Sequence, residues 1–236
     1  LQLGRGETIS DTAKIISGFC DALIIRTFKQ SDVDELGAHA SIPVINGLTD
    51  SDHPTQLLAD WATIREKFGN NIQGRKFVYL GDGNNMTHAW LMMGAIMGAH
   101  VVAATPSGKW APDATVVAKA KEIAAKSGGI VEVTHDPEAA AKDASVLYTD
   151  VWMSMGDPES ERAEKFAALS PFAIDDRLMS LTASDSIFMH CLPAHRGEEV
   201  AASVIDGPKS VIWREAYHRR TTIQALLYHL TRGDLK

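Results

Sequence analysis

The sequence has little cysteine, no long apolar run and no excess of basic charge. Two cysteines among 236 residues do not form a disulfide framework, which favours a reducing, cytoplasmic setting. No apolar run approaches the roughly 20 residues of a membrane span, and the first residues do not resemble a leader, so we expect no membrane association. The net charge of −7 argues against nucleic-acid binding, which needs a basic face.

The remaining composition is that of a globular protein, with 45% hydrophobic and 22% charged residues. Short apolar runs alternate with amphipathic segments, and this alternation predicts an α/β fold with parallel sheets. We predict strands over residues 21–26, 42–46, 77–80, 100–104, 131–133, 145–149, 187–189 and 211–213. We predict helices over residues 7–19, 54–67, 86–97, 113–126, 136–141 and 221–230, with further helix starts at Ser31 and Glu198. A polar break over residues 70–75 is the candidate domain boundary.

Polar clusters follow five of the predicted strands, where ligands bind in open parallel sheets. They are Arg26 and the segments 52–56, 81–85, 150–156 and 190–193. Each also has a plain structural explanation: Arg26 as a surface ion-pair residue, His53 in a helix-capping turn, or Asp150 as the start of a loop. The Gly81-Asp82-Gly83 segment resembles a dinucleotide loop, but Met86 stands where the third glycine would be, which argues against a nicotinamide cofactor.

The segment 190–197, His-Cys-Leu-Pro-Ala-His-Arg-Gly, follows an apolar strand and carries one of the two cysteines. Most single cysteines in soluble proteins are small buried hydrophobes. A thiol at a strand end, with a proline stiffening the turn and a glycine closing it, points instead to a site. The neighbouring clusters strengthen that interpretation.

Three of these motifs together resemble one known family. They are His53-Pro54-Thr55-Gln56, Asp150 with Ser154-Met155-Gly156, and His190-Cys191-Leu192-Pro193. The chain is similar over nearly its whole length to the aspartate/ornithine carbamoyltransferase family, and the last two motifs point to the ornithine branch. The resemblance implies transfer of a carbamoyl group from carbamoyl phosphate to the side-chain amine of L-ornithine, giving citrulline and phosphate, without a metal or other cofactor.

The resemblance also implies two groups of binding residues. Carbamoyl phosphate would be bound by Gln2, Arg26, His53, Pro54, Thr55, Gln56, Cys191, Leu192 and Arg219. Ornithine would be bound by Asn85, Asp150, Ser154 and Met155. Asp150 would position the attacking amine, and Cys191 would orient and polarise the ligands where they meet. Direct attack by ornithine makes a covalent intermediate on Cys191 unnecessary.

The family architecture implies two doubly wound parallel-sheet domains that face a cleft, the first truncated at its N-terminus. Residues 1–69 would be the remainder of the carbamoyl phosphate domain, residues 70–216 the ornithine domain, and the helix 217–236 would pack back on the first domain. That return would bring Arg219 near Arg26 and His53. Family members are usually homotrimers, which we expect of the full-length protein.

The chain departs from the family pattern in two places. The family's Ser-Thr-Arg-Thr phosphate loop does not occur, and the sequence starts at Leu1, as if entered partway through a domain. We therefore expect this chain alone to be weakly active or inactive. The usual Glu-Asn-Arg segment reads Tyr217-His218-Arg219, followed by Arg220, and His88 and Trp90 lie in the helix after Asn85 with no assigned effect.

Two alternatives remain open. One is a carbamoyltransferase for another amine such as putrescine, although an acceptor without an α-carboxylate would not need the Ser154-Met155-Gly156 loop. The other is a non-catalytic regulatory paralogue, which the missing phosphate loop favours. The retained polar groups at the strand ends argue against it, because they would otherwise only add desolvation cost.

Overall fold

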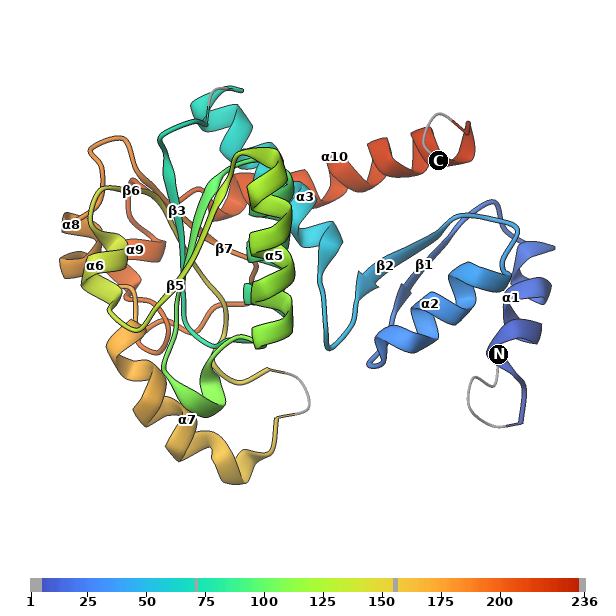
Figure 1. Cartoon of the computed structure of the whole chain (residues 1–236), viewed down its shortest axis with the longest axis horizontal. Coiled ribbons are helices and arrows are strands. Elements are labelled where there is room, and N and C mark those ends of the chain that lie inside the picture. Colours follow the sequence, from blue (N-terminus) through green and yellow to red (C-terminus); the bar gives the residue numbers. More distant parts are fainter. Residues whose placement is uncertain (1–5, 71, 155–156, 234–236) are drawn as a thin grey trace.

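Two parallel sheets organise the chain in the computed structural model, which describes residues 6–70, 72–154 and 157–233 (Figure 1). The larger sheet has the strand order β5-β4-β3-β6-β7, and the smaller sheet pairs β1 with β2. The strands are β1 (Leu23–Arg26), β2 (Val44–Leu48), β3 (Lys76–Leu80), β4 (His100–Ala104), β5 (Ile130–Thr134), β6 (Ala144–Thr149) and β7 (Ile187–His190). The expected α/β class with parallel sheets is confirmed.

The five-stranded sheet is covered on both faces because its central strand alternates between two cores. Phe77 and Tyr79 of β3 join one buried cluster with Trp90, whereas Val78 and Leu80 join the other. The helices of the first face are α4 (Asn85–Ile96) and α5 (Ala114–Ser127). The helices packed on the second face are α6 (Pro137–Ala141), α8 (Asp176–Ser180) and α9 (Ala202–Ile205). Strand order reverses between β3 and β6, which is where a doubly wound sheet binds ligands.

The smaller sheet lies beside this body, with α2 (Gln30–His39) packed on β2 and α1 (Ile9–Ser17) packed on α2 (Figure 1). Two helices join the parts: α3 (Pro54–Phe68), which follows β2, and α10 (Ile212–Thr231), which packs along α3. Trp61 of α3 contacts Phe77 and Trp90 in the larger core, with ring centroids 5.5 and 6.4 Å away. α3 therefore belongs to the core of the larger sheet while it starts from the smaller one.

The predicted strand over 211–213 and the predicted helix bounds at the C-terminus are wrong. Val211 N donates to Phe188 O at 3.0 Å, but the chain turns into α10 at Ile212. The apolar run is too short to add a strand, and the helix formers after it continue one 20-residue helix. The last helix thus starts at Ile212 instead of 217 or 221, and residues 234–236 lie outside the described part.

Two predicted helix starts are also wrong. α2 begins at Gln30, and no side chain caps it at Lys29. Glu199 lies in a turn, where its carboxylate accepts hydrogen bonds from His190 Nε2 and His195 N. The helix α9 begins only at Ala202. The predicted start at Asp136 is confirmed, since its side chain accepts from Glu138 N and Ala139 N.

In the part of the chain that the structure describes, no helix combines the length and apolar character that crossing a bilayer requires.

Candidate active site

The polar clusters predicted from the sequence gather at the carboxyl ends of the strands. The loops after β3 and β6 meet at the reversal of strand order, where Asn84 Nδ2 lies 3.4 Å from Asp150 Oδ2. Asn84 also caps α4, because its Oδ1 accepts from Met86 N and Thr87 N. The cap fixes the amide that faces Asp150.

Cys191 lies immediately after β7 and donates its thiol hydrogen to Asp150 Oδ1, with Sγ 2.9 Å away. Burial and the negative charge of Asp150 raise the pKa of the Cys191 thiol well above its ordinary value. The thiol is therefore protonated at neutral pH and is a poor nucleophile. This geometry favours the orienting role predicted for Cys191 over a covalent one.

Hydrogen bonds from neighbouring residues hold the turn that carries Cys191. Leu192 has φ 59°, a left-handed conformation that is uncommon for a non-glycine residue, and the Leu192–Pro193 peptide is cis. Leu192 N donates to His190 Nδ1 at 2.9 Å, so Nε2 of the ring carries the proton that faces Glu199 Oε1 at 3.2 Å. His190 and Glu199 are both fully buried and hold this turn in place.

A buried network joins α3, α10 and the end of β7. Gln56 Nε2 donates to Asp60 Oδ1 at 2.7 Å and to Glu215 Oε1 at 3.1 Å, while Gln56 Oε1 accepts from Arg219. Glu215 Oε2 accepts from His190 N at 3.0 Å. Gln56, Asp60 and Glu215 are at most 1% exposed. Through this network α10 is attached to α3 and to the end of β7.

The two acids of this network are close enough to influence each other. Burial raises the pKa of Asp60 to about 7, against the opposing hydrogen bond from Gln56. Burial and the charge of Asp60 raise the pKa of Glu215 well above its ordinary value. Glu215 is therefore the protonated partner at neutral pH, and the pair carries about one negative charge or less.

His53 stands just before α3, where Arg26 and Arg219 both act on it. Burial, then Arg219, then Arg26 lower the pKa of His53 to about 3. The ring is therefore neutral at pH 7, and its Nδ1 is buried with no hydrogen-bond partner among the described residues. A neutral imidazole between two guanidinium groups is suited to contact an anion without bringing a third charge.

The other predicted site residues lie in different settings. Thr55 Oγ1 donates to Gly47 O at 3.1 Å, Pro54 begins α3, and Asn85 Nδ2 donates to Thr49 O at 2.9 Å, which links α4 to the end of β2. Ser154 N donates to Asp157 Oδ2 at 2.8 Å. Gln2 and Met155 lie outside the described residues.

Three contributors were missed by the sequence reasoning, and a fourth, Asn84, lay in the predicted polar segment 81–85 but was given no role of its own. Asp60 lies one helical turn after Gln56, a spacing that could have indicated contact, and Asn84 precedes a helix as caps do. Glu215 and Lys165 gave no such signal. Their contacts depend on chain segments 159 and 83 residues away, and no local pattern records such distances.

The residues of α10 that depart from the family pattern lie beside Arg214 and Glu66, where α10 packs on α3. Arg214 Nε and His218 Nε2 both donate to Glu66 of α3, at 2.8 and 2.5 Å from its Oε2. Tyr217 lies between Arg214 and Arg220, whose guanidinium carbons are 4.8 and 5.2 Å from the ring centroid. In α4, His88 Nε2 accepts from Asp113 N at 2.9 Å, and Trp90 is fully buried in the core.

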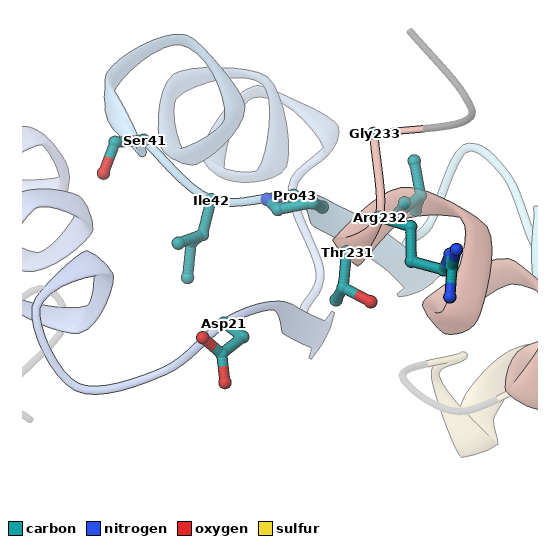
Figure 2. Close-up of a pocket in the computed structure, with 8 residues that line it drawn as sticks. Asp21, Ser41, Ile42, Pro43, Thr231, Arg232 and Gly233 are labelled. Carbon is teal, nitrogen blue, oxygen red and sulfur yellow. The ribbon is translucent and has the colours of Figure 1, made fainter.

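Two other features lie away from these groups. A hollow of about 710 Å³ is lined at the start of β1 and β2 and at the end of α10, and Figure 2 shows Asp21, Pro43 and Arg232 around it. It therefore opens at the edge of the small sheet opposite to Arg26. His195, Glu198 and Glu199 approach within 4.8 Å of one another, a spacing that could hold a metal ion, but Glu198 already pairs with Arg162.

Comparison with known proteins gives matches along nearly the whole chain. The family model for the aspartate/ornithine carbamoyltransferase carbamoyl-P binding domain matches residues 1–66, and that for the Asp/Orn binding domain matches residues 73–230. An ornithine carbamoyltransferase of Oceanobacillus iheyensis is 52% identical over 227 residues, which are 96% of this chain and 70% of that protein. One from Pyrococcus horikoshii is 51% identical, covering 99% of this chain and 73% of that protein. The solved ornithine carbamoyltransferase of Pyrococcus furiosus has a TM-score of 0.93 at 50% identity and covers 100% of this chain and 74% of that chain.

Proposed function

Because the chain belongs to the aspartate/ornithine carbamoyltransferase family, we propose that it transfers the carbamoyl group of carbamoyl phosphate to the side-chain amine of L-ornithine, giving L-citrulline and phosphate. Relatives about 50% identical over nearly the whole chain bear the ornithine carbamoyltransferase name. The observation that carries the proposal is the Asp150–Cys191 contact beside Asn84, at the reversal of strand order.

The carbamoyl phosphate half of the site comprises the groups around His53. Arg26 and Arg219 supply positive charge for the phosphate, and His53 is neutral under their influence. The uncharged ring can donate a hydrogen bond to the carbamoyl oxygen as negative charge develops there. The start of α3 adds the positive end of a helix dipole. Gln56 contributes to this half of the site by positioning Arg219, because its amide nitrogen already donates to Asp60 and its amide oxygen already accepts from Arg219.

The ornithine half comprises Asp150, Asn85, Ser154 and Met155. Asp150 is 9% exposed and accepts from Val151 N and Cys191 Sγ on one oxygen. Its charge suits an ammonium group of the amino acid and orients the attacking amine. In this proposal the Cys191 thiol, held protonated, and the carbonyl of Leu192 contact the carbamoyl group where the two ligands meet. The amine attacks the carbamoyl carbon directly and phosphate leaves.

We propose the domain division that the sequence predicts, with one adjustment. Residues 1–69 form the carbamoyl phosphate domain present in this chain and residues 70 to about 211 the ornithine domain. The helix that returns to the first domain begins at Ile212 instead of residue 217. A homotrimeric full-length protein, a cytoplasmic setting and a role in arginine metabolism complete the proposal.

A citrulline assay and a binding measurement test this function together. The chain is mixed with carbamoyl phosphate and L-ornithine, putrescine or L-aspartate, and the carbamoylated product is identified by mass. Calorimetry measures a bisubstrate mimic that joins a phosphonate to ornithine. We expect the mimic to bind much more tightly than L-ornithine, and any carbamoylated product to be citrulline.

Asp150→Asn should weaken the mimic about tenfold or more because the amide removes the charge opposite the ammonium group. Asp176→Asn, an exposed acid on α8, is the matched control and should bind as the unaltered chain does. Carbamoylation of putrescine in preference to ornithine, or a mimic that binds no better than ornithine, would overturn the proposal.

A further inference from the structure

Lys165 of α7 (Arg162–Leu169) is a buried charge that the proposed chemistry does not use. Its side chain is 3% exposed, and its Nζ lies 2.6 Å from Asp82 Oδ2 and 2.7 Å from Asp157 Oδ2. The ring centroid of Trp110 is 5.1 Å from the same nitrogen. Burial alone would lower the pKa of Lys165, but the two carboxylates outweigh it, and the net pKa is raised. Lys165 is therefore a fixed cation.

The two acids belong to the two loops that carry the predicted ornithine residues. Asp82 lies in the loop after β3, two residues before Asn84 and three before Asn85. Asp157 lies beyond β6, and the oxygen that Lys165 contacts also accepts from Ser154 N at 2.8 Å. One ammonium group thus connects the loop of Asn85 with the backbone of Ser154.

The loop after β3 is also held from its other side. Gly83 N donates to Trp110 O at 2.9 Å, and a Cβ on Gly83 would come within 2.3 Å of the backbone at Ala111. Only glycine permits this approach. Because the loop after β3 is fixed to the segment after β4 in this way, Lys165 transmits its position to Asp157 and through it to Ser154.

Stability alone gives little reason for a lysine here. A buried ion pair has to offset the desolvation of its charges, and apolar residues of similar volume often serve folding equally well. A cation with three donors can, however, hold two carboxylates at a set separation. The position between two binding loops makes that separation relevant to a ligand.

We propose that Lys165 is a positioning residue for the amino-acid substrate: it sets the distance between Asn85 and Ser154 by bridging Asp82 and Asp157. The inference rests on the proposed function and adds a determinant of amino-acid binding to it. Lys165 contacts neither ligand itself, so its effect falls on the ornithine half of the site and leaves the carbamoyl phosphate half unchanged.

The test uses Lys165→Met, Lys165→Arg and Asp157→Ala, with Lys121→Met on the exposed face of α5 as the matched control. Calorimetry compares two probes on each protein: the phosphonate–ornithine mimic, and phosphonoacetamide, which lacks the amino-acid part. We expect Lys165→Met to weaken the mimic by about tenfold to a hundredfold and to leave phosphonoacetamide unchanged. Lys165→Arg should restore most of the affinity.

Each outcome decides the question. A mimic affinity unchanged in Lys165→Met overturns the inference, and so does an equal loss for both probes, which would indicate a general structural role. If Lys165→Met does not fold, Asp157→Ala decides, because it removes the bond to Ser154 N and keeps the Lys165–Asp82 pair. If the unaltered chain binds neither probe, the proposed function itself has failed. Loss for the mimic alone, with rescue by arginine, supports the inference.

Discussion

Two regions of this molecule contain several buried ionisable side chains, and they offset the cost of burying charge in opposite ways. Near α7, Lys165 stands between two carboxylates, so unlike charges meet directly. Between α3 and α10, Asp60 and Glu215 lie together, and the nearest cation, Arg219, reaches them through Gln56. In the first region the carboxylates raise the pKa of Lys165 and keep it charged, whereas burial still raises the pKa of Asp82; the second region retains a proton. Burial therefore does not decide by itself whether a side chain is ionised; the charged partner beside it also counts.

The difference also separates two kinds of positioning. A cation between two acids holds two loops at a fixed spacing at every pH near neutrality. A pair of acids that shares a proton responds to pH near its raised pKa. The predicted ornithine loops depend on the first arrangement, and the predicted carbamoyl phosphate groups depend on the second.

The largest expected effect is on folding stability. Lys165→Met should lower the free energy of unfolding by about 3 kcal/mol because it leaves the buried Asp82 and the partly exposed Asp157 without their cation. Glu215→Gln should cost only about 1 kcal/mol, since the acid it replaces is already neutral and only one hydrogen bond is impaired. Urea denaturation followed by circular dichroism measures both. Equal losses in the two variants would break the contrast between the regions.

A smaller effect concerns pH. The pKa of Asp60 is raised from 3.8 to about 7, so its contribution to stability is fully present below about pH 4 and is lost as the pH rises through 7. Asp60→Asn cannot ionise, and between pH 5 and pH 8 it should gain about 2 kcal/mol relative to the unaltered chain. Urea denaturation at both pH values gives the difference, with Asp176→Asn as control.

The comparison of Asp60→Asn with the unaltered chain is needed because His53 also makes stability depend on pH. Its pKa is lowered to about 3, so its contribution is present above about pH 6.5 and is lost as the pH falls. It opposes the trend of Asp60 in the unaltered chain but cancels in the difference. A difference that does not change between pH 5 and pH 8 would contradict a retained proton at Asp60.

The smallest effect concerns the thiol of Cys191, which lies beside the buried Asp150. Cys20 is exposed, whereas burial and Asp150 raise the pKa of Cys191. Iodoacetamide at pH 8 should therefore alkylate Cys191 at least about tenfold more slowly than Cys20, as followed by peptide mass spectrometry. Asp150→Asn should speed the reaction at Cys191 alone. Equal rates at the two cysteines would indicate a thiolate and reopen the nucleophilic role.

Much of the fold could be predicted because its signals are local. Apolar runs and caps located the strands and α6, and strand ends located Arg26, Asp150 and Cys191. The start of α10 was misplaced because its first residues are apolar like a strand, and the helix is set by packing against α3. Asp60, Glu215 and Lys165 could not be assigned because burial and distant partners give them their properties.

The geometry of α10 has a mechanical consequence. Glu215 and Arg219 are four residues apart, on the same face of one rigid helix. The first is attached to the end of β7 through His190 N, and the second reaches the start of α3 through Gln56. A translation of that helix moves both attachments in the same direction and by the same amount. α10 thus links two contacts that belong to different parts of the molecule. A ligand that displaces Arg219 therefore also displaces the turn that carries Cys191.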